Sequence, residues 1–227
     1  MADTTGKEKT ETLSAAEHIA VFIQNNRFFL IVLLVIVAAG IAGFITFYAV
    51  RDVLQKEAIV RVEEFERRLE EIEDPGDASK AGETQTLLDE LNEFAPKSFG
   101  YAAGKAYSLA ASIHAAREEW AEAEKAYLAS ARKADRIYLA PLSMYNAAVA
   151  AEEQGRLDEA ASYYGQSLNY SVIFPAAVRA QFAIGRLHEE QNNKEAALDA
   201  YRLVIEKWPD DITWTNFAHA RIISLGG

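Results

Sequence analysis

The fold is decided by the stretch AIGRLHEEQNNKEAALDAYRLVIEKWP, residues 183–209, because its pattern occurs twice more in the chain. In each copy a small residue is followed 12 positions later by alanine, and 4 positions after that by tyrosine. The copies are spaced by 37 residues and consist of Ala111, Ala123 and Tyr127, of Ala148, Ala160 and Tyr164, and of Gly185, Ala197 and Tyr201. Self-similarity at a fixed spacing of this size indicates a protein built from stacked structural repeats.

Packing within a helical hairpin explains why these residue types recur. The small residue of the first helix lets the second helix come close, the alanine of the second helix receives it, and the aromatic ring fills the gap to the next repeat. Turn residues divide the chain into helical stretches of about 12–20 residues, and no segment shows the alternation typical of strands. We expect breaks at Pro75-Gly76, Pro96, Pro141, Gly155, Pro175 and Pro209.

An apolar segment precedes the repeats. Residues 28–50, FFLIVLLVIVAAGIAGFITFYAV, are 23 consecutive positions without a charge. At about 1.5 Å per residue they cross a hydrocarbon core of roughly 30 Å. A cleaved signal peptide would have an apolar run of only about 7–15 residues. Arg27 and Arg51 flank the segment, and Tyr48 lies where an interfacial aromatic is expected. The sequence therefore predicts an uncleaved transmembrane helix.

The region before this helix divides into two parts. Residues 1–13 have the composition of a disordered polar tail. Residues 14–27 form an amphipathic lead-in, in which Ser14 and Glu17 have the spacing of a capping box. We expect the lead-in to lie on the membrane surface or to continue into the transmembrane helix.

The third copy of the repeat shows its pattern most fully, with Ile184, Gly185, His188, Ala197, Tyr201 and Pro209 in order. It resembles the tetratricopeptide repeat, a helical hairpin with this order of small and aromatic residues. The departures are Gln181 at the usual tryptophan, His188 at the usual tyrosine, and a period of 37 where the family has about 34. The resemblance covers residues 101–209 and implies an α-solenoid.

Helical segments flank the repeats. Residues 53–72 and 83–94 are predicted to form a degenerate hairpin, and residues 211–225 a capping helix. The expected fold is all-α: one transmembrane helix, then a tetratricopeptide-like α-solenoid of about three clear hairpins with those two flanking elements. The expected organisation is a tail (1–13), a lead-in (14–27), a transmembrane helix (28–50), a linker helix with the degenerate hairpin (51–96) and the repeat domain (97–227).

Two segments carry a closer resemblance, AEHIAVFIQNNRFF at 16–29 and SFGYAAGKAYSLAASIHAAREEWAEAEKAYLASARK at 98–133. With the anchor between them, they are similar to the YfgM-type proteins, ancillary Sec translocon subunits of bacterial inner membranes. The resemblance implies a cytoplasmic N-terminus and a periplasmic repeat domain. It also implies that the protein acts near the translocon, together with a membrane-bound chaperone, on client polypeptides as they emerge.

The flanking charges favour the opposite topology. Within 20 residues of the apolar segment there are two basic residues before it and five after it, which by the positive-inside rule places the repeats in the cytoplasm. The downstream basic residues alternate with glutamates at helical spacing, so helix ion pairs also explain them. Charge alone leaves the orientation open.

Composition excludes several kinds of site. The 227 residues include 34 acidic and 23 basic side chains, giving a net charge of −11, and no cysteine. The absence of cysteine excludes disulfides, cysteine-based zinc sites and thiol nucleophiles. The acidic balance argues against nucleic acid as a partner, because phosphate binding requires clustered lysine and arginine.

The remaining residues give no catalytic pattern. His114 and His188 occupy the same repeat position, where a packed side chain is expected rather than a ligand. The run Gly100–Lys105 is one residue too short for a phosphate-binding loop and follows no strand. Paired acids such as Glu118-Glu119 lie at helix ends and are expected to be solvated. We expect no enzyme activity, no cofactor, no metal and no small-molecule substrate.

Function is therefore expected on the concave face that the first helices of a solenoid form. The resemblance places groove positions by register at Lys105, Ser108 and Ser112, at Leu142, Tyr145 and Val149, and at Arg179, Phe182, Arg186 and Glu189, with Ala115 and Glu152 completing the rows. Tyr145 and Phe182 either anchor a bound protein segment or only fill the solenoid. The carboxylate clamp of related repeats needs lysine and asparagine where this chain has Ser108 and Ser112, so binding of that type is not expected.

Two functional classes remain. The first is an accessory of translocation and folding, whose groove binds translocon components, a membrane-bound chaperone or client polypeptides. The second is a structural adaptor in an envelope complex such as a motor or secretion apparatus. In both classes the partners are proteins, with the lipid bilayer contacting residues 28–50.

Overall fold

A computed structural model describes residues 15–134, 137–170 and 174–227. These residues form ten α-helices and one short 3₁₀ helix, and none of them lies in a strand, so the all-α prediction is confirmed. The expected tail and Ser14 of the capping box lie outside the described residues. The chain divides into two compact units, residues 1–53 and 54–227.

The first unit contains α1 (Ala15–Asn25) and most of the apolar part of α2 (Arg27–Glu71). Asn26 separates the two helices, and its side-chain amide donates a hydrogen bond to the Phe22 carbonyl oxygen at 2.9 Å. The lead-in is thus a helix of its own. The predicted transmembrane segment lies entirely within α2, which is long and apolar enough to cross a membrane and buries none of its most apolar stretch. It is a candidate membrane span.

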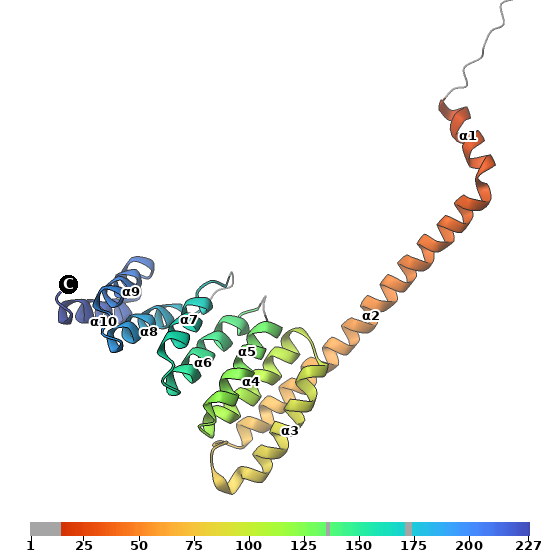
Figure 1. Ribbon diagram of the computed structural model, residues 1–227. Coiled ribbons are helices and arrows are strands. Elements are labelled where there is room, and N and C mark those ends of the chain that lie inside the picture. Colours follow the sequence, from red (N-terminus) through yellow and green to blue (C-terminus); the bar gives the residue numbers. More distant parts are fainter. Residues whose placement is uncertain (1–14, 135–136, 171–173) are drawn as a thin grey trace, which may run out of the picture. The chain divides into compact units, whose positions relative to one another are not determined.

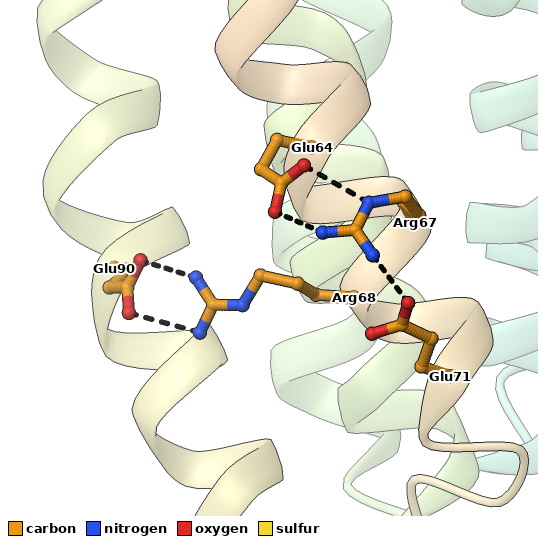
Figure 2. A network of polar contacts seen from close by, with 5 residues as sticks. All are labelled: Glu64, Arg67, Arg68, Glu71 and Glu90. Atoms are coloured by element: carbon orange, nitrogen blue, oxygen red, sulfur yellow. Dashed lines mark hydrogen bonds and ion pairs between the residues drawn. The ribbon is translucent and has the colours of Figure 1, made fainter.

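The second unit begins with the expected degenerate hairpin, made by the end of α2 and by α3 (Ala81–Lys97), with the 3₁₀ helix Ala78–Lys80 between them. Val62 and Phe65 of α2 are buried against Leu87 and Leu91 of α3. An ion pair between side chains also links the two helices. Arg68 donates hydrogen bonds to both carboxylate oxygens of Glu90, at 2.7 and 3.1 Å (Figure 2).

Two predicted breaks are wrong, because both prolines lie inside helices. Pro96 is in the last turn of α3, where its missing N–H removes one backbone hydrogen bond and the helix then ends at Lys97. Pro141 is in the first turn of α6, where the N–H has no partner within the helix in any case.

Three hairpins and a capping helix follow, each packed on the one before (Figure 1). The hairpins are α4 (Gly100–Ala116) with α5 (Trp120–Lys133), α6 (Leu139–Glu153) with α7 (Leu157–Ser167), and α8 (Ala177–Glu190) with α9 (Lys194–Lys207). The cap is α10 (Ile212–Ser224), which packs on α9 and α8. The predicted solenoid architecture is confirmed.

The 37-residue register also holds at the level of single residues. Ala123, Ala160 and Ala197 are each completely buried between helices. In each hairpin the turn uses one residue with a left-handed backbone, and these residues are again 37 apart: Glu118, Gly155 and Asn192, with φ of 58°, 72° and 60°. The three hairpins are thus copies of one local structure.

Candidate protein-binding face

The ten predicted groove residues lie on α4, α6 and α8, the first helices of the three hairpins. None of the ten is buried, whereas the opposite sides of these helices are covered by their hairpin partners and by neighbouring repeats. On α6, for example, Met144, Ala147 and Ala148 are buried while Leu142 and Val149 reach solvent. We call the surface formed by the ten residues the A-helix face.

Residues 37 apart occupy equivalent positions on neighbouring first helices. Lys105, Leu142 and Arg179 therefore form one row of the A-helix face, and Ser108, Tyr145 and Phe182 the next. Within a row, the chemistry of the side chains changes from one first helix to the next along the solenoid. The α4 side presents short hydroxyl side chains, α6 presents apolar ones, and α8 presents guanidinium groups.

The two predicted aromatic anchors belong to separate clusters. The Tyr145 ring lies 5.1 Å from the Tyr164 ring and 6.0 Å from the Phe174 ring, between centroids. Burial raises the pKa of the Tyr145 hydroxyl, and the charge of Arg179 opposes that rise. Tyr145 is therefore both a packing residue and part of the exposed face.

Phe182 is held by the C-terminal cap. Its ring lies 5.0 Å from Tyr201 of α9 and 5.1 Å from Trp214 of α10, between centroids. Phe182 thus helps to dock α10 on the third hairpin. The structure does not bring Tyr145 and Phe182 into one aromatic site.

Arg186, a predicted groove residue, forms an ion pair within the solenoid. Its Nη2 lies 2.6 Å from Oε1 of Glu152 on the preceding first helix. The hydroxyl of Tyr164 donates a hydrogen bond to the other oxygen of Glu152 at 3.3 Å. The carboxylate of Glu152 therefore joins two repeats, and its charge is balanced within the face.

The same arrangement recurs one repeat later. The Tyr201 hydroxyl donates to Glu189 at 3.0 Å, and Arg221 of α10 forms an ion pair with the same carboxylate. In the first hairpin, the equivalents of Glu152 and Arg186 are Ala115 and Val149, so the first junction is apolar. Tyr127 lacks a carboxylate at this position, and burial raises its pKa to about 12.

Sequence reasoning missed the role of Arg221 and the two tyrosine hydroxyls. A signal was present, because Glu152 and Glu189 are 37 apart, as are Tyr164 and Tyr201. The structure also brings three predicted residues into one surface pocket of about 480 Å³. Its lining consists of Phe182, Arg186, Glu189, Glu190, Tyr201 and Arg221.

Three of the predicted residues lie on α4. Lys105 is mostly buried and forms an ion pair with Glu66 of α2, so its charge is also balanced. The Ser112 hydroxyl donates to the Leu109 carbonyl oxygen at 2.8 Å. These contacts leave Arg179 as the cation of the A-helix face that makes no ion pair with a residue the structure describes.

The two repeat histidines, His114 and His188, are half-buried. Nδ1 of His114 lies 2.5 Å from Oε2 of Glu119, and Nδ1 of His188 is buried without a hydrogen-bond partner. Across the described parts of the chain, histidine, aspartate and glutamate form no group of three suited to hold a metal ion.

Comparison with known proteins identifies the repeats. Residues 108–168 and 166–212 match the family model for the tetratricopeptide repeat. The chain is also 35% identical over 161 residues to a TPR repeat-containing protein of Treponema pallidum (strain Nichols). That alignment covers 69% of this chain and 66% of the relative, so the chain spans just under two thirds of the relative's length.

Proposed function

We propose that this chain, whose residues 108–212 are tetratricopeptide repeats, is a membrane-anchored module that binds other proteins through its A-helix face. Such repeats are typically non-catalytic scaffolds for protein–protein interaction. The observation that carries the proposal is that none of the ten residues of the face is buried and that Leu142, Arg179 and Arg186 are exposed, on three stacked helices. The apolar part of α2 supplies the anchor.

The electrostatics of the face support a protein ligand over a charged small molecule. Glu152 and Arg186 balance each other, as do Glu189 and Arg221, and Lys105 with Glu66. Charged side chains that already pair within the protein do not need an opposite charge from a ligand, and removing them further from water on binding would cost free energy. Affinity must then come chiefly from apolar contact, as at the centre of protein interfaces.

The more specific form of the proposal is an accessory role at the Sec translocon. In that role the N-terminus is cytoplasmic, the repeats are periplasmic, and the face binds translocon components, a membrane-bound chaperone or emerging clients. Support comes from the resemblance of residues 16–29 and 98–133 to YfgM-type proteins and from the candidate span between them.

Photo-crosslinking in intact cells tests the binding face. A crosslinking residue at Leu142, which is exposed on α6, is expected to capture proteins. The matched control places it at Gln166, an exposed residue of α7 on the second helix of the same hairpin. Equal capture at both positions, or capture only at Gln166, would move the binding surface off the A-helix face.

Topology needs its own measurement. Protease added to cells with a permeable outer envelope and an intact inner membrane should digest the repeats. Digestion that begins only after the inner membrane is opened would place the repeats in the cytoplasm and exclude the translocon role.

A second function, a structural adaptor in an envelope complex, is favoured by one observation. The cap α10 leaves three large apolar side chains exposed, with Ile212 72%, Phe217 52% and Ile223 75% accessible. An adaptor would bury such a surface against one permanent neighbour. Crosslinking from Ile223 to a single protein in constant ratio, with none from Leu142, would select the adaptor over the client-binding module.

A further inference from the structure

An apolar stripe runs along α6 and is exposed to solvent at its N-terminal end. Tyr138, Leu142, Tyr145 and Val149 follow one another at intervals of 4, 3 and 4 residues, which places them on one side of the helix. Tyr138 is 56% exposed and Leu142 37%, while Tyr145 and Val149 are half-buried. At about 1.5 Å per residue the stripe is roughly 16 Å long.

One side of the stripe is positively charged. Arg179 occupies on α8 the position that Leu142 occupies on α6, and its side chain is exposed. Its guanidinium lies 6.0 Å from the centre of the Trp214 ring, which fixes its position without neutralising it. Among the residues that the structure describes, none supplies a carboxylate to Arg179 within ion-pair distance.

The other side of the stripe is formed by α4, where Tyr101 and Lys105 are the equivalents of Tyr138 and Leu142, and Lys105 is paired with Glu66. Ser108 and Ser112 are the equivalents on α4 of Tyr145 and Val149, and the Ser112 hydroxyl is occupied by a backbone carbonyl. The surface is therefore an apolar strip flanked on the α8 side by Arg179, which makes no ion pair with a residue that the structure describes.

We propose that the segment bound here is an amphipathic α-helix whose apolar stripe packs along α6 and whose flank toward α8 is acidic. The inference rests on the proposed function and specifies its partner. A helix presents side chains at i, i+4, i+7 and i+11, the same spacing as the stripe, whereas an extended segment alternates its side chains between two faces. The acidic flank follows from charge complementarity with Arg179.

The test uses synthetic peptides and the full chain in lipid nanodiscs. Three peptides share one leucine stripe at helical spacing and carry glutamate, glutamine or lysine beside it; a fourth has the glutamate sequence interrupted by two prolines. Fluorescence anisotropy should show the glutamate peptide binding about two- to fivefold more tightly than the glutamine peptide. The lysine and proline peptides should bind most weakly.

Variants of the chain test whether Arg179 and the apolar stripe are the residues that bind the peptides. Arg179→Gln should remove the preference for glutamate over glutamine, while the control Arg132→Gln, at an exposed position of α5, should keep it. Leu142→Asp should abolish binding of every peptide, with Tyr138→Ser as a second variant at a more exposed position. Circular dichroism of each variant shows whether the helices remain folded.

Each other outcome overturns the inference. Equal binding of the glutamate and lysine peptides removes the charge argument, and tight binding of the proline peptide indicates an extended ligand. If no peptide binds while crosslinking from Leu142 still captures proteins in cells, the helical partner is wrong and the protein-binding function stands.

Discussion

Gly185 of α8 and Tyr201 of α9 lie so close together that a Cβ atom on residue 185 would be 2.6 Å from Cε1 of the tyrosine ring. Tyr201 is completely buried, and its hydroxyl is held by Glu189 at 3.0 Å. The ring therefore cannot move away without losing that hydrogen bond. In the first two hairpins the equivalent small residues, Ala111 and Ala148, pack in the same clusters as Tyr127 and Tyr164.

The first prediction follows from this contact. Gly185→Ala should destabilise the protein by about 1–3 kcal/mol, because the added methyl group overpacks the third hairpin. The control is Gly165→Ala on α7, where a Cβ would meet no atom within 4 Å. That change should be neutral or stabilising, since alanine favours a helix over glycine by about 1 kcal/mol. Urea unfolding in detergent, followed by tryptophan fluorescence, measures both, and equal midpoints for the two variants would contradict the close contact.

The left-handed turn residues give a second prediction. Glu118 has φ of 58° at the position that Gly155 occupies in the next hairpin. Glu118→Gly should raise stability by about 1 kcal/mol, because only glycine adopts this conformation without steric cost. Its neighbour Glu119 has φ of −83°, so Glu119→Gly should not be stabilising. Thermal unfolding by circular dichroism distinguishes them, and a lower midpoint for Glu118→Gly would show that its side chain is needed.

A third prediction concerns Glu124, a buried carboxylate of α5. It forms an ion pair with Arg156 and accepts hydrogen bonds from Gln154 at 3.0 Å and Tyr163 at 3.2 Å. Arg156→Gln should cost about 1–3 kcal/mol, because it leaves a buried charge without its counterion. The double variant Glu124→Gln with Arg156→Gln should recover part of the loss. A double-mutant cycle measures the coupling, and strictly additive effects would mean that the pair contributes nothing.

The fourth prediction is a pH dependence in the degenerate hairpin formed by the end of α2 and by α3. Hydrogen bonds from Arg68 hold the pKa of Glu90 below its ordinary value of 4.5. A lowered pKa in the folded state stabilises the protein above pH 4.5, and the contribution is lost as the pH falls through the folded value. Between about pH 5 and pH 3 the urea midpoint should fall further for the wild type than for Glu90→Gln. Parallel curves for the two proteins would show that the carboxylate titrates normally.

The repeat spacing in the sequence determined how the helices of the three hairpins pair and which small and aromatic residues they bury, although it did not place every helix end. The reason is that small residues and aromatic rings at a constant spacing of 37 specify one hairpin, and equal hairpins can bury their apolar sides only by stacking. The apolar segment in α2 could also be predicted from the sequence, because its length and composition are local properties of the chain.

Tertiary structure alone decided the partners of the charged groups. Arg186 pairs with a residue 34 positions earlier, Arg221 with one 32 positions earlier, and Lys105 with one 39 positions earlier. No single spacing predicts these pairs, because each depends on how far one hairpin is rotated against the next and on which side chains then come within reach. The sequence placed three cations on one face, and packing between repeats left Arg179 as the one without a carboxylate among the described residues.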